Sequence, residues 1–170
     1  MQEKNLKTLT GISKLVLLLL MAATVIFIFV NSMLPPEKSQ EQSDGIKDVI
    51  IEVLPDNSKA ESFVEQYIRK VAHFTEYGLL GIELALYLAL FERRRAWLMA
   101  IAPVLPFFVG FIDESIQIAS KRGPSIEDVW IDIGGFVTFY LLSLAVFGAV
   151  MLVLYLVKRH KGVKKETNGS

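Results

Sequence analysis

Ionisable and hydrogen-bonding side chains gather at the ends of otherwise apolar segments of this chain of 170 residues. They fall into three groups, at residues 69–77, 113–117 and 122–132. A charged side chain is costly inside a lipid bilayer, so groups at the edge of apolar segments are expected to pair or to function. The candidate functional residues are Arg69, Lys70, His73, Glu76, Tyr77, Asp113, Glu114, Gln117, Arg122, Ser125, Asp128 and Asp132.

The cations in these groups could bind an anionic ligand. Arg69, Lys70 and Arg122 carry donors that match the oxygens of a phosphate or carboxylate, and a guanidinium can form two parallel hydrogen bonds to such a group. A lipid head group would supply these oxygens. The alternative is structural, because acid–base pairs between helices would satisfy buried polar groups and hold the helices together.

The acids and the histidine support a second kind of chemistry. His73, Glu76 and Asp113 are candidate catalytic residues, because a histidine beside a carboxylate can act as a general acid–base pair. The same residue types could coordinate a divalent ion. A zinc site is not predicted, since this group holds one histidine and the chain has no cysteine. The sequence therefore predicts no metal and no cofactor, and it leaves open whether the protein is an enzyme.

Other catalytic and nucleotide-binding motifs are absent from the sequence. No Gly-x-Ser-x-Gly motif surrounds Ser115 or Ser125, and no glycine-rich phosphate-binding loop occurs. The 18 basic and 18 acidic residues give a net charge of zero, so binding of nucleic acid is not indicated. The lack of cysteine also excludes disulfides and cysteine nucleophiles.

Four apolar segments are long enough to cross a bilayer, which needs roughly 20 mostly apolar residues. They lie at about residues 12–34, 71–91, 96–119 and 126–157. The first is expected to be retained, because no small-x-small cleavage pattern follows it. Pro103 and Pro106 predict a kink in the third. The predicted fold is a single all-α domain over residues 1–170, an integral membrane bundle of four transmembrane helices.

The basic residues predict the orientation of this bundle. Four spans place both termini on one side, together with Arg93–Arg95 and the lysines of the tail 158–170. Cytoplasmic loops carry the excess of Lys and Arg, so both termini are predicted to be cytoplasmic. The protein is then a multi-pass protein of the cell membrane, and residues 35–70 form an outer segment. Within that segment, residues 46–54 fit either an amphipathic helix or a strand, and a helix from about Lys59 should continue into the second span.

Helical spacing predicts that the polar residues meet inside the bundle. One face of the second span, a sector of about 80°, is polar along most of its length and must avoid lipid. Asp113 and Gln117 share a face of the third span, as Asp128 and Asp132 do on the fourth. All three groups converge at the outer edge of the membrane. The residues of the polar face are Arg69, His73, Glu76, Leu80, Glu83 and Tyr87.

Two further signals concern packing. Glycines in the spans would let helices approach closely, and a homo-oligomer could form through the same glycine faces. Ser125 with Asp128 forms a pattern similar to a capping box at the start of the fourth span. The glycines are Gly78, Gly81, Gly110, Gly134 and Gly135.

The three groups, in this order, resemble the VanZ-like family of bacterial membrane proteins. The resemblance rests on Arg-Lys-x-Ala-His-Phe-x-Glu-Tyr-x-x-Leu at 69–80, Asp-Glu-x-x-Gln at 113–117 and Arg-x-x-Ser-x-x-Asp-x-x-x-Asp-x-x-Gly at 122–135. It implies a membrane protein of four helices. The family's named member lowers susceptibility to the glycopeptide teicoplanin, without altered peptidoglycan precursors. The resemblance marks the motif residues as functional and assigns them no reaction.

Three functions follow as hypotheses. The first is an outward-facing polar pocket that binds the head group of an anionic membrane lipid or a lipid-linked cell-wall precursor, and so limits access of lipoglycopeptides to the cell surface. The second is an enzyme acting on a lipid-linked phosphate, with His73 and Glu76 as the acid–base pair. The third is a structural accessory subunit whose polar network only holds the fold.

Overall fold

The protein is all-helical in the part of the chain that the structure describes. The computed structural model describes residues 2–35, 58–90, 102–120 and 125–167, with a few single positions between them. No strand occurs in these ranges, in agreement with the predicted all-α fold. The elements are α1 (Gln2–Ser32), α3 (Ser58–Ala89), the short 3-10 helix η2 (Ala102–Val104), α5 (Leu105–Ala119) and α6 (Ile126–Thr167).

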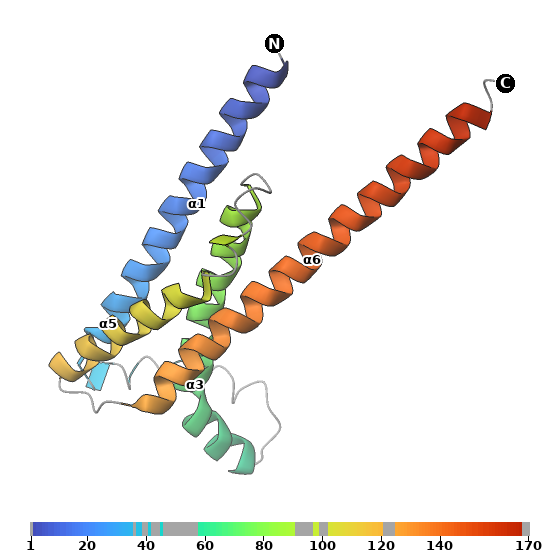
Figure 1. Ribbon diagram of the computed structural model, residues 1–170. Coiled ribbons are helices and arrows are strands. Elements are labelled where there is room, and N and C mark those ends of the chain that lie inside the picture. The colour runs from blue at the N-terminus through green and yellow to red at the C-terminus, as the bar shows by residue number, and fades with distance from the viewer. Residues whose placement is uncertain are drawn as a thin grey trace.

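The helices converge at one end of the molecule and spread apart at the other (Figure 1). The ends of α1 and α5 and the start of α6 lie at the convergent end, and α3 passes between α1 and α6. The start of α1 and the end of α6 both lie at the opposite end. Arg122, the basic residues 93–95 and the segment 46–54 lie outside the described residues, so their predicted roles stay predictions.

Helices α3 and α6 pack most extensively, and glycines allow their backbones to touch. A Cβ at Gly81 would lie 2.5 Å from the Phe136 carbonyl oxygen, and one at Gly135 would overlap the Phe74 carbonyl group. Only glycine fits at such points. The predicted role of these two glycines in close packing is therefore confirmed. The contact also fixes the register that brings the middle of α3 against the first turns of α6.

The core lies beside this contact. Tyr77 and Leu80 of α3 and Phe136 and Tyr140 of α6 are at most 1% exposed, and Ile28 of α1 joins them. The Phe136 and Tyr140 rings stack with centroids 5.7 Å apart. Aromatic side chains bury large areas, so this small group holds three helices together.

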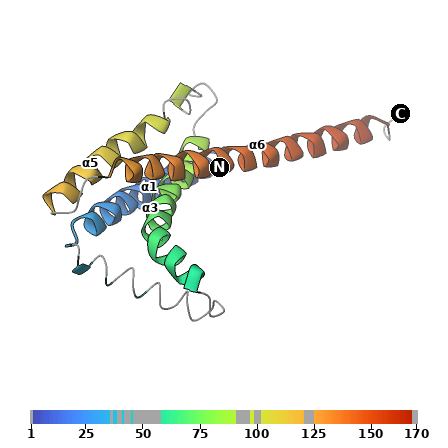
Figure 2. The same cartoon turned by 90° about the horizontal axis from the view of Figure 1, so that it is seen from below.

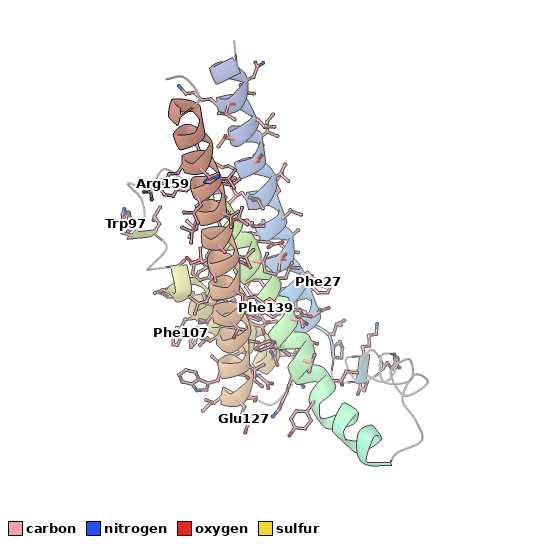
Figure 3. The ribbon with its side chains drawn as sticks, turned by 90° about the vertical axis from the view of Figure 1, so that its right-hand side faces the viewer. Phe27, Trp97, Phe107, Glu127, Phe139 and Arg159 are labelled. Carbon is pink, nitrogen blue, oxygen red and sulfur yellow. The ribbon has the colours of Figure 1, made fainter. Side chains whose placement is uncertain are left out.

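In the part of the chain that the structure describes, two helices are long and apolar enough to cross a membrane, Asn5–Ser32 within α1 and Ile126–His160 within α6. Their outward faces are apolar as well: in Figure 3, Phe27 projects from α1 away from the other helices, and its side chain is about half exposed. A soluble monomer rarely exposes so continuous an apolar surface. Such helices suit a surrounding of lipid, where a helix satisfies all its own backbone groups.

Helix α5 is shorter than the predicted segment 96–119. It begins at Leu105 and follows η2, with Pro106 in its first turn. A proline in the first turn gives up an N–H that has no helical partner, so it starts a helix without cost. The two prolines therefore lie before α5 and in its first turn, and the predicted kink of the longer segment 96–119 stays a prediction because residues 99–101 lie outside the described residues. With 15 residues, the helix is about 22 Å long.

Helix α6 starts as predicted and runs ten residues beyond the predicted end at 157. The Ser125 hydroxyl accepts a hydrogen bond from the Asp128 N–H at 3.2 Å, which is the capping bond that the sequence predicts. In a capping box, the side chain of Asp128 would accept a hydrogen bond from the Ser125 N–H. Here the Glu114 carboxylate of α5 accepts that bond instead. The C-terminal part of α6, whose side chains from residue 151 to 160 are all exposed, extends away from the other helices (Figure 2).

Candidate functional site

A buried group of ionisable side chains lies where the four helices converge. His73 of α3 and Asp132 of α6 lie 3.1 Å apart, between Nδ1 and Oδ1. Asp113 of α5 completes the group, and one ligand-type atom from each residue lies within 4.8 Å of the other two. Asp113 is 0% and Asp132 1% exposed. We call these three residues the acidic centre.

Both oxygens of Asp113 accept hydrogen bonds from neighbouring side chains. The Ser32 hydroxyl, at the end of α1, donates to Oδ1, and the Gln117 amide donates to Oδ2 at 3.1 Å. Gln117 is one turn from Asp113 on the same helix and is fully buried, as the shared face predicts. Asp113 is therefore held in one orientation.

Tyr77 closes the acidic centre from below. Its side chain is fully buried, and its hydroxyl lies beside the Asp132 carboxylate without a hydrogen-bond partner among the described residues. A Cβ at Gly110 would lie 3.7 Å from both the Tyr77 hydroxyl and Asp132 Oδ2. A buried hydroxyl without a partner is costly, so its position needs an explanation.

Arg69 lies one turn before His73, at the rim of the acidic centre. Its Nη2 donates to the Gln117 side-chain oxygen at 2.9 Å, and the same atom is 3.9 Å from Asp128. The side chain is 41% exposed, whereas its buried Nε has no partner among the described residues. The guanidinium has five N–H donors, and among the described residues a single hydrogen bond, from Nη2, is made by them.

Lys70 and Glu127 form a second, more exposed pair at the rim. Their charged atoms are 2.8 Å apart, and the Glu127 side chain is 77% exposed. The hydrogen bond and charge of Glu127 raise the pKa of Lys70 above its usual value. Figure 3 shows Glu127 at the end of α6 opposite to Arg159. Such exposed pairs contribute little to stability.

Helix α1 supplies three donors that the sequence pattern does not mark as functional. Thr24 donates to Glu83 at 3.0 Å, Asn31 donates to Glu76 at 2.9 Å, and Ser32 donates to Asp113. In an apolar helix such residues usually bond to their own backbone, so they attracted no functional prediction. One signal in the sequence could have predicted these bonds. Thr24 is seven residues from Asn31, and Glu76 is seven residues from Glu83, so two helices packed side by side can pair them.

The predicted polar face of α3 is confirmed to face inward. His73, Leu80 and Glu83 are less than 9% exposed, and Glu76 is half-buried. Glu83 lies two turns below Glu76, in the apolar part of the bundle, and its second carboxylate oxygen has no partner among the described residues. The sequence therefore correctly predicts which face of this helix meets the others.

The predicted site residues separate into a buried centre and an exposed rim. Glu114 points away from the centre to the start of α6, as the difference of about 100° from Asp113 predicts. The centre itself is closed rather than open, because its carboxylates are no more than 1% exposed. The described residues do show one cavity of about 340 Å³ elsewhere, an apolar one between α3 and α6 lined by Leu86, Phe139 and Val146 among others.

Charge decides which ligand each part could take. The acidic centre holds two carboxylates and one imidazole, so its net charge is negative unless protons or a cation neutralise it. An anion would be repelled from it. The rim carries Arg69 and Lys70 and is open to the surroundings, so an anion would bind there.

The order of these groups along the helices is that of a known family. The family model described as VanZ/LLP1 matches residues 15–160. This chain belongs to the VanZ/LLP1 family. The match covers α1 from its apolar part, α3, α5 and most of α6, with all the candidate functional residues, and it confirms the resemblance seen in the sequence. No curated protein and no solved structure matches the chain. Family and apolar helices together identify a membrane protein of the VanZ/LLP1 family.

Proposed function

We propose that this VanZ/LLP1 protein binds the anionic head group of a membrane lipid or of a lipid-linked cell-wall precursor at its rim, through Arg69 and Lys70. The observation that carries the proposal is Arg69. It is a partly exposed guanidinium whose Nη2 donates to Gln117 at 2.9 Å, and its other donors have no hydrogen-bond partner among the described residues. Arginine suits phosphate oxygens because its planar fork donates two parallel bonds.

The proposal includes a topology. Four helices cross the cell membrane, α1, α3, the α5 region with η2, and α6, and both ends are cytoplasmic. Lys7 and Lys14 lie near the start of α1, and Arg159 lies near the end of α6. Both helix ends are at the same end of the molecule in Figure 1, which supports this orientation because cytoplasmic ends carry the excess of basic residues. The rim then faces the outer surface, where lipid head groups and cell-wall precursors are found.

The acidic centre refines where the ligand binds. A phosphate would not enter it, because two buried carboxylates repel an anion and the centre is closed. The head group therefore lies above the centre, against Arg69, and its acyl chains lie along the apolar outer faces of the helices. Binding at the cell surface would limit access of lipoglycopeptides such as teicoplanin.

Native mass spectrometry of the full-length protein tests the head-group proposal. The protein is purified in detergent and offered phosphatidylglycerol or phosphatidylcholine at equal concentration. We expect phosphatidylglycerol to be retained preferentially, and Arg69→Ala to lose at least about 10-fold of that retention, since a charge-assisted hydrogen bond contributes about 1.5–3 kcal/mol. Glu127→Gln is the matched control, because it frees Lys70 and should retain the lipid as well as wild type or better.

Equal retention of the two lipids by wild type would refute the proposal. So would Arg69→Ala retaining phosphatidylglycerol as wild type does. In cells, deletion of the gene should change the minimal inhibitory concentration of teicoplanin, and complementation with Arg69→Ala should not restore it. If that variant does restore it, Arg69 at the rim is not required for the effect on teicoplanin susceptibility.

One observation favours the enzymatic alternative as a second candidate. The His73–Asp132 pair, at 3.1 Å, has the arrangement of a base whose ring is oriented by a carboxylate. A hydrolase of lipid-linked phosphates would use His73 as acid or base with the phosphate held by Arg69. Release of inorganic phosphate from undecaprenyl phosphate or diphosphate by the purified protein, lost in His73→Gln, would favour this candidate over simple binding.

A further inference from the structure

The acidic centre has the composition and size of a cation site. His73, Asp113 and Asp132 come from three different helices, α3, α5 and α6, and one ligand-type atom from each lies within 4.8 Å of the others. Ligand atoms around a tetrahedral metal with bonds of about 2.0–2.1 Å are separated by about 3.3 Å. The His73–Asp132 separation of 3.1 Å already matches this value.

The charges of the centre call for a positive partner. Two carboxylates, at most 1% exposed, face one imidazole, so even a protonated His73 leaves one negative charge. Arg69 does not neutralise this charge, because its guanidinium donates to Gln117 and the carboxylate with which it forms an ion pair is that of Asp128. Uncompensated charge in a buried site is strongly unfavourable. A bound cation would remove this cost, as would a proton on one of the two carboxylates, and the experiment below distinguishes the two.

Tyr77 gives an independent indication of a missing ligand. Its side chain is fully buried, and its hydroxyl lies beside Asp132 with no hydrogen-bond partner among the described residues. The chain thus places an unpaired oxygen next to two carboxylates and an imidazole. A hydroxyl there could bind a metal-coordinated water or the metal itself, which would satisfy it.

The surrounding residues also resemble the support of a metal site. Ligating carboxylates in proteins are usually held by further hydrogen bonds, and Asp113 is held by Ser32 from α1 and by Gln117 from its own helix. One nitrogen and two carboxylate ligands suit Zn²⁺ or Mn²⁺, whereas Mg²⁺ and Ca²⁺ prefer oxygen alone. The sequence did not predict this site, because its ligands are 40 and 19 positions apart and no metal motif connects them.

We propose that His73, Asp113 and Asp132 bind one divalent transition metal ion, Zn²⁺ or Mn²⁺, with Tyr77 beside it. The ion ties α3, α5 and α6 together beneath the rim. It also neutralises the two carboxylates below Arg69, which removes their repulsion of an anionic head group. The site does not depend on lipid binding, since the rim and the centre use different side chains.

Metal content and thermal stability of the full-length protein test the site. The protein is purified in detergent without a polyhistidine tag, treated with EDTA, and offered ZnCl2, MnCl2 or MgCl2. We expect about one equivalent of Zn²⁺ or Mn²⁺ by mass spectrometry of the metal. We also expect a rise of several degrees in Tm over the metal-free protein, since a ligand that binds only the folded state stabilises it. Mg²⁺ should have a much smaller effect.

Variants distinguish this site from adventitious binding. Asp132→Asn and His73→Gln keep the size of the side chain and should lose the metal-dependent rise in Tm, with affinity about 100-fold weaker. His160→Ala, in the exposed end of α6, and Glu127→Gln are the controls and should respond as wild type. A wild-type protein with no stoichiometric metal and no response to any of the three salts would overturn the proposal. A full response in Asp132→Asn would overturn it too.

The two proposals fail separately. Arg69→Ala should lose phosphatidylglycerol and keep its Zn²⁺ or Mn²⁺ response. Loss of lipid selectivity in wild type with metal retained would reject the head-group function alone. Lipid selectivity without any metal response would reject the metal site alone.

Discussion

Ser32, the last residue of α1, donates its hydroxyl proton to Asp113 of α5, and both side chains are at most 2% exposed. The bond links the first helix to the centre of the candidate site, at a point where neither segment could satisfy its polar group alone. Helices that meet in lipid are held by such bonds and by close packing, because lipid gives no hydrophobic force between them.

Removing the Ser32 hydroxyl should therefore destabilise the protein. Ser32→Ala leaves one oxygen of a buried carboxylate without its donor, which costs about 1–3 kcal/mol. The measurement is the Tm in detergent. Ser115→Ala is the matched control, because the Ser115 hydroxyl is exposed and bonds only to the Phe111 carbonyl of its own helix. Equal Tm values for the two variants would contradict this role of Ser32.

Two adjacent glycines of α6 should differ sharply on substitution by alanine. A Cβ at Gly135 would overlap the Phe74 backbone, whereas one at Gly134 would meet only the Phe74 ring at an ordinary 3.9 Å. Gly135→Ala should separate α3 from α6 and cost about 1–3 kcal/mol or more. Gly134→Ala should be neutral or slightly stabilising, since alanine favours the helix. Chemical or thermal unfolding of both variants measures the difference, and similar stabilities would show that the helices are not in backbone contact.

The sequence predicts the helices and their inward faces better than it predicts their partners. The polar face of α3 follows from helical spacing and the cost of charge in lipid, and the structure confirms it. Thr24, Asn31 and Ser32 could not be assigned in the same way, because a hydroxyl or amide in an apolar helix has its own backbone as an alternative partner. Their true partners depend on how α1 is rotated and placed along α3 and α5, which no local pattern encodes.

The division of the site into centre and rim was likewise beyond the sequence. Asp113 and Glu114 are neighbours in the chain, but their side chains point about 100° apart around the helix axis. Asp113 therefore lies in the buried acidic centre, whereas Glu114 accepts a hydrogen bond from the N–H of Ser125 at the start of α6. The sequence predicts that they diverge. It does not show that Asp132, rather than Glu76, comes within 3.1 Å of His73, because that depends on the Gly135 contact between α3 and α6. The start of α5 differed for a local reason, since a proline can begin a helix as well as bend one.

Glu83 should be needed for its shape and hydrogen bond rather than for its charge. Its carboxylate accepts a bond from Thr24 at 3.0 Å, and in the described part of the chain no ion pair includes it. Glu83→Gln retains an acceptor of the same size and should leave Tm close to that of wild type. Glu83→Ala creates a cavity and leaves Thr24 unpaired, with a loss of about 2 kcal/mol or more. A loss in Glu83→Gln as large as that in Glu83→Ala would indicate that the charge itself is required.

The absence of cysteine makes the proposed topology directly testable. Single cysteines introduced at Lys7, Glu127 and Arg159 should separate by side in intact cells. Glu127→Cys should react with a membrane-impermeant maleimide from outside. Lys7→Cys and Arg159→Cys should react only after the membrane is opened. The reverse pattern would place the rim on the wrong side for an outer-leaflet head group. Labelling of all three from outside would contradict the proposed cytoplasmic termini.

The most direct test of the head-group function compares two substitutions of Arg69 in nanodiscs of phosphatidylcholine that contain a small fraction of phosphatidylglycerol. Arg69→Lys keeps the charge and loses the bidentate fork, whereas Arg69→Ala loses both. The amount of phosphatidylglycerol that remains bound to the extracted protein should fall in the order wild type, Arg69→Lys, Arg69→Ala. If all three proteins retain the same amount, Arg69 does not bind the head group, and the proposed function is wrong.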